Sequence, residues 1–485
     1  MAKRKAKTSL SALSIIMILI ILLGLVTHFL PAATFVDEEI VAGSGVEAAT
    51  LSQILLSPIQ GLADAVDVIT FVLILGSFLA IVTKTGALDA GIKALVRKLK
   101  GHELVLIPIL MFIFSVGGTT YGMLEETVGF YALLAFTMVA AGMDTIVSSA
   151  TVLLGAGSGC LGSTINPFAT GAGLAALKSA GVEFNNGTVM LLGVLLWLTS
   201  LAISIAFVMT YAKKVIKDKG STFLSLQEEK VMERKYKKEQ KETNEKMTGR
   251  QKVTLVIFGL AFLVMIAGFI PWVDLGILSE EVADAGTHWS AFLTGNCFGY
   301  WWFDDATLWF LLSTIIIGII NGFSEKELVE TIISGAADMM GVVLVVAVAR
   351  GASVLMSATY LDNYIIYNAA DFLKTVPQYL FVPLNYILHI FLSILVPSSS
   401  GLASLSTPIM GPLAQTVGYS TEVTVMTYVA ANGLVNLITP TCGAIMGGLS
   451  LAGVEYSTWF KWGIRVVATI ALASVVILTV AALVL

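Results

Sequence analysis

The sequence has little charge for its length. Lys, Arg, Asp and Glu make up 13% of the 485 residues, about half the share found in a typical soluble protein. Hydrophobic residues make up 56% of the chain, and the mean hydropathy is +0.88. This composition excludes a water-soluble globular domain and predicts a membrane protein, for which the lipid bilayer is the main partner.

Cysteine and histidine are also scarce. The cysteines are Cys160, Cys297 and Cys442, and the histidines are His28, His102, His288 and His389. An odd cysteine count without metal-like spacing argues against a disulfide framework, so we expect the thiols to be small apolar fillers. For His389 a packing role is favoured over proton transfer. Since the sequence offers no nucleophile–base pair, metal cluster or phosphate loop, we expect no enzyme, no nucleic-acid partner and no cofactor beyond a coupling ion.

The basic residues that remain are clustered. Of the 28 Lys and Arg, 13 lie between Lys213 and Lys252, four in Lys3–Lys7 and five between Lys84 and Lys100. Basic loops stay on the cytoplasmic side of a membrane, so these three stretches, and with them the N-terminus, are predicted to be cytoplasmic. The acidic stretches Pro31–Ser57 and Pro271–Asp305 contain no Lys or Arg and are predicted to lie outside.

The first apolar run, Leu10–Leu30, is too long for a cleaved signal and predicts a membrane helix in a bacterial cytoplasmic (inner) membrane. A second helix is expected at Val68–Thr83, with an interfacial turn near Ser57–Pro58 before it. The aromatic residues Tyr300–Phe303, together with Trp309, are typical of an interface belt.

One proline-containing loop occurs twice, inside apolar segments long enough to cross a membrane. It reads Gly162–Gly171 in one half and Val435–Gly443 in the other, and a shift of 273 superposes Ile165-Asn166-Pro167 on Ile438-Thr439-Pro440. Free backbone groups are costly in hydrocarbon, so such loops survive only inside protein or beside a site. Paired interrupted helices in two internal repeats are typical of the substrate site of a transporter.

A short apolar run precedes each of these loops. Leu104–Val116 has 13 residues and ends in Gly117–Gly122, which predicts a re-entrant hairpin rather than a full span. Val382–Val396, followed by Pro397–Gly401, predicts a second hairpin that enters from the other side.

The predicted fold is an all-α polytopic membrane protein with two inverted repeats, each with a re-entrant helical hairpin and a broken transmembrane helix. The N-terminal half spans 1–212, with its hairpin at 104–141 and its broken helix at 143–180. A charged cytoplasmic linker, 213–252, is expected to be a solvated helix or coil. The C-terminal half spans 253–485, with its hairpin at 377–416, its broken helix at 421–452 and an external C-terminus.

The chain resembles the YfcC family of basic amino acid antiporters, relatives of the anaerobic four-carbon dicarboxylate carriers in the ion transporter superfamily. The resemblance is carried by GGTTYGMLEETVGFYALL at Gly117, GSTINPFATG at Gly162 and PSSSGLASLSTPIMGPLA at Pro397. It implies that hairpin tips and unwound helices together hold the substrate and often sodium. It also implies that a homodimer is possible.

Two clusters of small polar residues are therefore candidate substrate-binding residues. The first comprises Gly118, Thr119, Thr120, Ser163, Thr164, Asn166 and Pro167, and the second Ser398, Ser399, Ser400, Asn436, Thr439, Pro440 and Thr441. Sodium is the possible coupling ion, at Gly118, Thr119, Ser163 and Asn166 and at Ser399, Ser400, Asn436 and Thr439. The alternative is that these small residues only permit close helix packing.

Charged residues inside apolar segments complete the candidate set. Glu125 and Glu126 follow the first tip, and neighbours on a helix point about 100° apart, so at most one is expected to face the cavity. Arg350 interrupts an apolar helix and suits either a substrate carboxylate or a structural ion pair. Asp144 and Asp338 are expected to be partners of helix N-termini.

These charges favour exchange of basic amino acids, arginine or ornithine among them, by alternating access. A basic substrate needs donors for its carboxylate and an acid for its cationic groups, whereas acids beside the tip would oppose a dicarboxylate. The alternative is a sodium- or proton-coupled carrier of small mono- or dicarboxylates.

Overall fold

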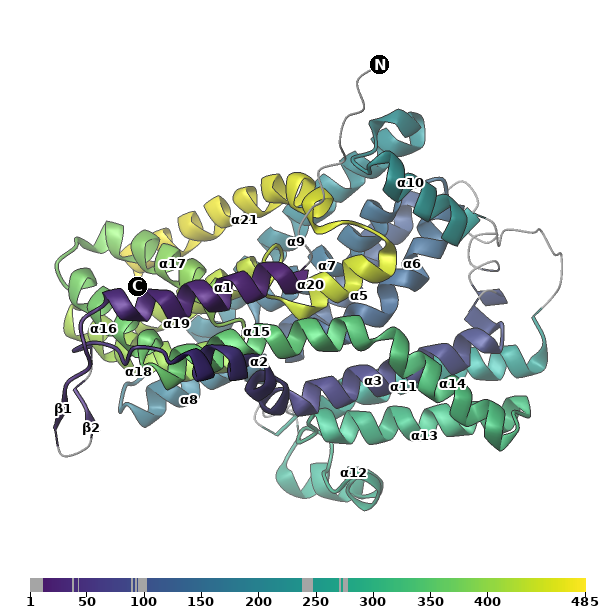
Figure 1. Ribbon diagram of the computed structural model, residues 1–485, viewed down its shortest axis with the longest axis horizontal. Coiled ribbons are helices and arrows are strands. Elements are labelled where there is room, and N and C mark those ends of the chain that lie inside the picture. The colour runs from purple at the N-terminus through teal and green to yellow at the C-terminus, as the bar shows by residue number, and fades with distance from the viewer. Residues whose placement is uncertain are drawn as a thin grey trace.

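The computed structural model describes residues 12–36, 39–41, 43–88, 90–91, 94, 103–237, 247–269, 272–273 and 278–485. The basic stretch Lys3–Lys7, His102 and most of the stretch from Lys84 to Lys100 lie outside the described residues. The described part is almost entirely helical (Figure 1). The exception is a pair of two-residue antiparallel strands, β1 (Phe35–Val36) and β2 (Glu39–Ile40).

Within the described residues, six helices are long and apolar enough to cross a membrane, which confirms the predicted class of an all-α polytopic membrane protein. They are α3 (Val66–Lys84), α7 (Thr145–Gly162), α9 (Asn186–Lys217), α11 (Gly249–Phe269), α13 (Phe303–Asn321) and α21 (Tyr456–Val484). The successive helices α14 (Glu325–Asp338) and α15 (Met340–Ala358) are bent by 46° and count as a seventh if they form one span.

In the first half a helical hairpin precedes a broken helix. The hairpin comprises α5 (Leu106–Tyr121), a 3-10 turn (Glu125–Thr127) and α6 (Val128–Ala140). The turn predicted at Gly117–Gly122 is placed too early, because α5 continues through Tyr121. It ends at Gly122, whose φ of 80° suits a residue without a Cβ. The broken helix comprises α7, a π-turn (Pro167–Gly171) and α8 (Ala172–Ser179).

The second half contains the same order of elements. Its hairpin comprises α17 (Gln378–Leu395) and α18 (Ser399–Thr416). Its broken helix comprises α19 (Thr421–Val435) and α20 (Gly443–Ala452), separated by a non-helical stretch of small and polar residues. The Ser398 hydroxyl caps α18 by accepting a hydrogen bond from the Gly401 N–H at 3.1 Å.

The two broken helices cross at glycines. A Cβ built on Gly433 of α19 would lie 2.4 Å from the Leu161 Cα of α7. A Cβ on Gly157 of α7 would lie 2.1 Å from the Leu437 side chain. Backbone therefore packs directly on backbone here, as small residues allow between membrane helices.

The helices α1 (Ala12–Val26), α2 (Leu51–Asp64) and α15 pack beside this pair. The interfacial turn predicted near Ser57–Pro58 is wrong, because that stretch is part of α2. A capping box between Thr50 and Gln53 starts α2. Asp338 is the last residue of α14, and Met339 precedes α15 without a side-chain cap, so the predicted N-terminal role of Asp338 is wrong.

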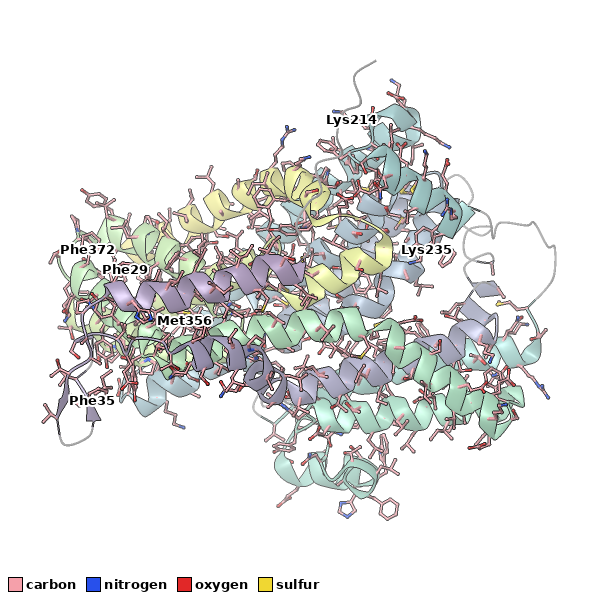
Figure 2. All side chains as sticks on the ribbon, viewed as in Figure 1. Phe29, Phe35, Lys214, Lys235, Met356 and Phe372 are labelled. Atoms are coloured by element: carbon pink, nitrogen blue, oxygen red, sulfur yellow. The ribbon has the colours of Figure 1, made fainter. Side chains whose placement is uncertain are left out.

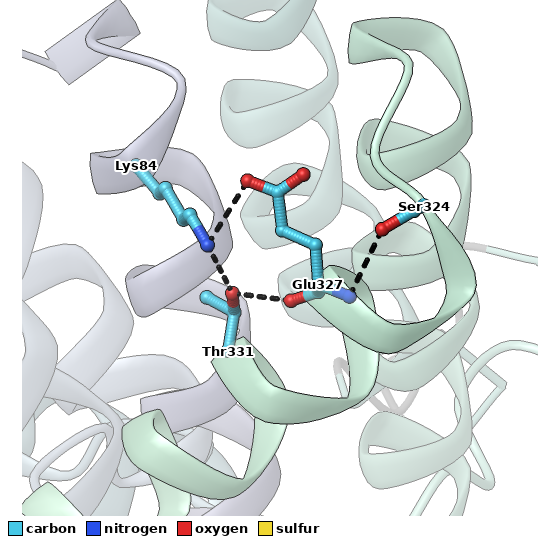
Figure 3. A network of polar contacts seen from close by, with 4 residues as sticks. All are labelled: Lys84, Ser324, Glu327 and Thr331. Atoms are coloured by element: carbon cyan, nitrogen blue, oxygen red, sulfur yellow. Dashed lines mark hydrogen bonds and ion pairs between the residues drawn. The ribbon is translucent and has the colours of Figure 1, made fainter.

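The helices α3, α11, α13 and α14 form a second group. Phe78 of α3 stacks on Phe258 at 5.7 Å and meets the Phe310 ring edge-on at 4.9 Å, which joins α3 to α11 and α13. Figure 3 shows the polar contact of α3 with α14: the Lys84 Nζ lies 3.1 Å from the Glu327 carboxylate and donates to the Thr331 hydroxyl at 3.0 Å. In Figure 1 this group is displaced along the long axis of the molecule relative to α1, α2 and α15.

The two ends of the molecule differ in character. Figure 2 places Lys214 and Lys235 at the end where the linker lies, and Phe29, Phe35 and Phe372 at the opposite end. The strands β1 and β2, helix α16 (Leu361–Leu373) and the end of α21 share that opposite end (Figure 1). Helix α12 (Glu280–Thr294), from the acidic stretch before α13, projects from the side.

The described part of the linker contains a helix and is mostly exposed, in keeping with its prediction as a solvated helix or coil, but a few buried residues, Glu228 and Tyr236 among them, dock it on the protein. It forms α10 (Leu226–Met232) and a π-turn (Glu233–Lys237). Buried Tyr236 packs on Phe136 and donates to the Leu451 carbonyl at 2.8 Å. Lys235 donates to the same carbonyl at 2.8 Å, and burial lowers its pKa. The linker thus fixes the end of α20.

Asp144 begins the first broken helix as predicted. Its carboxylate caps α7 by accepting from the Val147 N–H at 3.0 Å. The other oxygen accepts hydrogen bonds from the Tyr211 hydroxyl at 2.5 Å and from Thr222 of the linker at 2.7 Å.

Candidate functional site

A cavity of about 170 Å³ lies where the two halves meet. Its walls come from the break of the first hairpin, both broken helices, the tip of the second hairpin, the start of α3, the start of α13 and α15. Of the predicted site residues, those that line it are Glu125, Glu126, Asn166, Arg350, Ser398, Ser399, Ser400, Asn436 and Thr441.

Both glutamates after the first tip line the cavity. The expectation that at most one would face it rests on a continuous α-helix, whereas Glu125 and Glu126 lie in a 3-10 turn that follows the break. The Glu126 carboxylate accepts a hydrogen bond from the Leu124 N–H at 3.1 Å. The buried turn therefore points two acids at one cavity.

Arg350 is the basic residue of the cavity wall. Its Nε lies 3.3 Å from the Asp64 carboxylate at the end of α2, an ion pair that joins α15 to α2. Asp67, on the first turn of α3, also lines the cavity and accepts a hydrogen bond from the Trp302 indole N–H at 3.0 Å. These two aspartates were missed, although they are the only acids of the apolar stretch Leu51–Thr83 and could have been found there.

Three residues of the first cluster, Gly118, Thr119 and Thr164, hold the hairpin to the broken helix. The Thr119 hydroxyl accepts a hydrogen bond from the Thr164 N–H at 3.0 Å, and the Thr164 hydroxyl donates to the Thr119 carbonyl at 3.2 Å. Thr120 bonds within its own helix, and Gly118 packs on α7. The residues that line the cavity do not include Gly118, Thr119, Thr120, Ser163, Thr164 or Pro167.

Asn166 is the member of the first cluster that reaches the cavity. Its Nδ2 donates to the Ser163 hydroxyl at 3.0 Å, and its Oδ1 accepts from the Phe168 N–H at 2.9 Å. Both ends of the amide are therefore used within the break, which fixes the side chain against the cavity.

The second cluster is more open to the cavity. Ser398, Ser399 and Ser400 at the start of α18 line it. The Asn436 Nδ2 donates to the Asn432 Oδ1 at 3.3 Å, whereas the buried Asn436 Oδ1 accepts no hydrogen bond in the described structure. Thr439 bonds to Thr441 at 2.8 Å behind the wall, and Pro440 lies outside the cavity lining. Asn436 therefore lines the cavity, and its Oδ1 is a buried acceptor without a partner among the described residues.

The two clusters differ in how well they fit sodium, which takes oxygen ligands. In the first cluster the Thr119 hydroxyl accepts a hydrogen bond from the broken helix, and the Ser163 hydroxyl and the Asn166 Oδ1 accept hydrogen bonds within the break. In the second cluster the Asn436 Oδ1 is free and the serines of the tip are half-buried. A coupling sodium ion would therefore find more available oxygens at Ser399, Ser400 and Asn436 than in the first cluster.

His389 and Trp302 were both expected to have structural roles, but only Trp302 lines the cavity. His389 is fully buried, with Nε2 2.6 Å from the Ser406 hydroxyl and Nδ1 2.9 Å from the Asn385 carbonyl, as expected of a packing histidine. Trp302, expected in an interface belt, instead lines the cavity.

Comparison with known proteins identifies the family. The profile of the C4-dicarboxylate anaerobic carriers, DcuC, matches residues 10–483. An uncharacterized protein of Haemophilus influenzae is 31% identical over 431 residues, which cover 89% of this chain and 78% of that protein. The Escherichia coli protein named "Putative basic amino acid antiporter YfcC" is 27% identical over 425 residues, which cover 84% of this chain and 76% of that protein.

Two solved structures are similar over nearly their full length. The YdaH transporter of Alcanivorax borkumensis is 15% identical with a TM-score of 0.46, covering 97% of this chain and 98% of its own. MtrF of Neisseria gonorrhoeae is 16% identical with a TM-score of 0.44, covering 99% of this chain and 96% of its own. On the match along almost the entire sequence, the chain is a multi-pass membrane transporter that belongs to the C4-dicarboxylate anaerobic carrier (DcuC) family.

Proposed function

We propose that this transporter exchanges basic amino acids, such as arginine and ornithine, across the bacterial cytoplasmic membrane. The observation that carries the proposal is the charge of the cavity wall. Among the described residues that line the cavity, Asp67, Glu125 and Glu126 contribute three carboxylates, whereas Arg350 is the one basic residue and is already paired with Asp64. A wall of this charge attracts a cationic substrate and repels a dicarboxylate.

The remaining groups suit the backbone end of an amino acid. The N-terminus of α18, at Ser399 and Ser400, presents backbone N–H groups that favour a carboxylate. Arg350 can add a bidentate contact to that carboxylate. The free Asn436 Oδ1 can accept a hydrogen bond from the α-ammonium group, which Glu125 would also attract.

Transport would proceed by alternating access. In this proposal the two halves are inverted repeats, the hairpins are re-entrant, and the hairpin-bearing units move against the group of α3, α11, α13 and α14. The N-terminus would be cytoplasmic, the C-terminus external and the carrier a homodimer. Lys214 and Lys235, at the linker end of the molecule in Figure 2, support this orientation.

Counterflow in proteoliposomes tests the function. External labelled arginine should accumulate when the lumen contains ornithine or arginine, and should not when it contains succinate. Asn436→Ala should weaken uptake because the ammonium loses its acceptor. If arginine and ornithine neither exchange nor compete, the proposal is wrong.

Glutamine substitutions test the role of the acids. Glu125→Gln or Glu126→Gln should raise the KM for basic amino acids by about tenfold, the equivalent of roughly 1.4 kcal/mol for one lost charge contact. Purified variants should keep the melting temperature of the parent, since Gln fills the same space. An equal rise of the KM for cationic and for neutral substrates would indicate a folding defect instead.

A sodium- or proton-coupled carrier of small carboxylates is the second candidate. Arg350 and the N-terminus of α18 are the observations that favour it, because both bind anions. Thermal stabilisation of the purified protein by succinate but not by arginine would support this candidate against the first.

A further inference from the structure

Trp302 is fixed in the cavity wall from several sides. Its indole N–H donates to the Asp67 Oδ2 at 3.0 Å, and its ring centroid lies 4.6 Å from that of Phe168 in the first broken helix. Its backbone N–H donates to the Asp305 carboxylate at 2.8 Å, which starts α13. The side chain is still 45% exposed. A large aromatic surface is therefore held in one orientation while part of it remains open.

The Asp67 carboxylate has one oxygen without a partner among the described residues. Its Oδ2 accepts the indole hydrogen bond, and within the described residues its Oδ1 has no hydrogen-bond or ion-pair partner. A carboxylate that only anchored Trp302 could be an amide, since one acceptor suffices. The carboxylate beside the exposed ring leaves one negatively charged oxygen available to a ligand.

We infer that Asp67, Trp302 and Phe168 form the subsite for the side-chain cation of the substrate, and that this subsite favours a guanidinium over a primary ammonium. The inference rests on the proposed function. A guanidinium is planar and weakly hydrated, stacks on the face of an indole and pairs with a carboxylate through parallel N–H donors. A primary ammonium is a compact, strongly hydrated charge that gains less from the ring.

The subsite also combines elements that are far apart in the sequence. Asp67 and Trp302 belong to α3 and α13, whereas Phe168 belongs to the π-turn of the first broken helix. A guanidinium bound here would contact the group of α3 and α13 and the broken helix at once. The carboxylate of Asp67 and the indole ring of Trp302 would therefore contact the same guanidinium group.

Substitutions at two positions separate the contribution of the aromatic ring from that of the charge. Asp67→Asn keeps an acceptor for the indole N–H and removes only the negative charge. Trp302→Leu removes the aromatic face, and Trp302→Phe keeps a smaller one. Trp309→Leu is the matched control, because Trp309 bonds to the Ala261 carbonyl and lies outside the cavity lining.

The measurement is the KM of counterflow for arginine and for ornithine. Trp302→Leu should raise the KM for arginine about tenfold, the equivalent of one cation–π contact, and that for ornithine less than about threefold. The KM of Trp302→Phe for arginine should lie between those of the parent and of Trp302→Leu. If the leucine variant does not fold, the phenylalanine variant provides the test. Asp67→Asn should raise both KM values, and Trp309→Leu should leave their ratio unchanged.

An unchanged ratio of the two KM values in both Trp302 variants would overturn the inference, as would an unchanged KM in Asp67→Asn. Either result leaves basic amino acid exchange intact, provided that the parent protein still exchanges arginine and ornithine. If the parent exchanges neither, the proposed function fails and the inference falls with it.

Discussion

Glycines, which have no side chain, determine how closely the broken helices α7 and α19 approach each other. At Gly433 the nearest atom to an added Cβ is a backbone Cα, which cannot rotate away as a flexible side chain can. Adding atoms to a well-packed contact usually lowers the free energy of unfolding by about 1–3 kcal/mol, and a clash with backbone should cost an amount at the upper end of this range. Since both helices line the cavity, the cost affects the site as well as the fold.

We therefore expect Gly433→Ala to lower the melting temperature of the purified protein and its yield in the membrane. Gly259→Ala is the control, because Gly259 lies in the middle of α11 and nothing lies within 4 Å of the added Cβ. Its effect should stay within about 0.5 kcal/mol. Equal melting temperatures for the two variants would contradict the close crossing of α7 and α19.

At the same scale, the sequence predicted part of the cavity wall. Glu125, Glu126 and Arg350 could be nominated because a charge inside an apolar segment is costly unless it has a partner or a function. Trp302 could not be nominated, since an aromatic residue near a helix start is equally typical of a membrane interface. Only the fold brings it beside Asp67, which is 235 residues away in the chain.

At the scale of elements, α10 of the linker connects to the corner between α20 and α21. The Glu228 carboxylate accepts hydrogen bonds from the Ser225 N–H at 2.6 Å, the Glu455 N–H at 2.8 Å and the Thr458 hydroxyl at 3.0 Å. One buried carboxylate thus caps α10 and binds the start of α21. This contact fixes the linker to the second half.

Glu228→Ala should cost about 2–3 kcal/mol, because it leaves buried N–H groups without an acceptor. Hydrogen exchange should become faster at the backbone of α10 and of the first turn of α21. The neighbouring exposed Gln227→Ala should change neither the stability nor the exchange. Unchanged protection in Glu228→Ala would mean that the linker is not docked.

The linker also shows where sequence reasoning is weak for elements. Its alternating charges have no apolar face, so local pattern indicates a solvated segment. Tyr236 is nevertheless buried, because a single aromatic residue on a polar segment can dock when a partner surface is available. In the same way, the end of α5 depends on packing against α7, which keeps Gly117–Tyr121 helical.

At the scale of the whole molecule, the cavity contains two of the three cysteines. Cys160 of the first half and Cys442 of the second line it, whereas Cys297 lies in the loop before α13. A water-filled substrate site should admit a small thiol reagent, and a bound substrate should exclude it.

We expect a small maleimide to label Cys160 more slowly when arginine is present. Cys297 reports on the same molecule and should react at a rate that does not depend on arginine. Labelling of variants that retain a single cysteine, measured by mass spectrometry, assigns each labelling rate to Cys160 or to Cys297. Equal effects of arginine on Cys160 and Cys297 would indicate a global change of structure instead of occupancy of the cavity.

The carboxylates of the cavity also affect the carrier when it is empty. Without a ligand, no substrate balances the carboxylates of Asp67, Glu125 and Glu126, and any negative charge they carry is costly to move through a low-dielectric layer. A bound basic amino acid brings positive charge and offsets part of this cost. The loaded carrier would therefore reorient more readily than the empty one, so that one substrate leaves mainly when another returns.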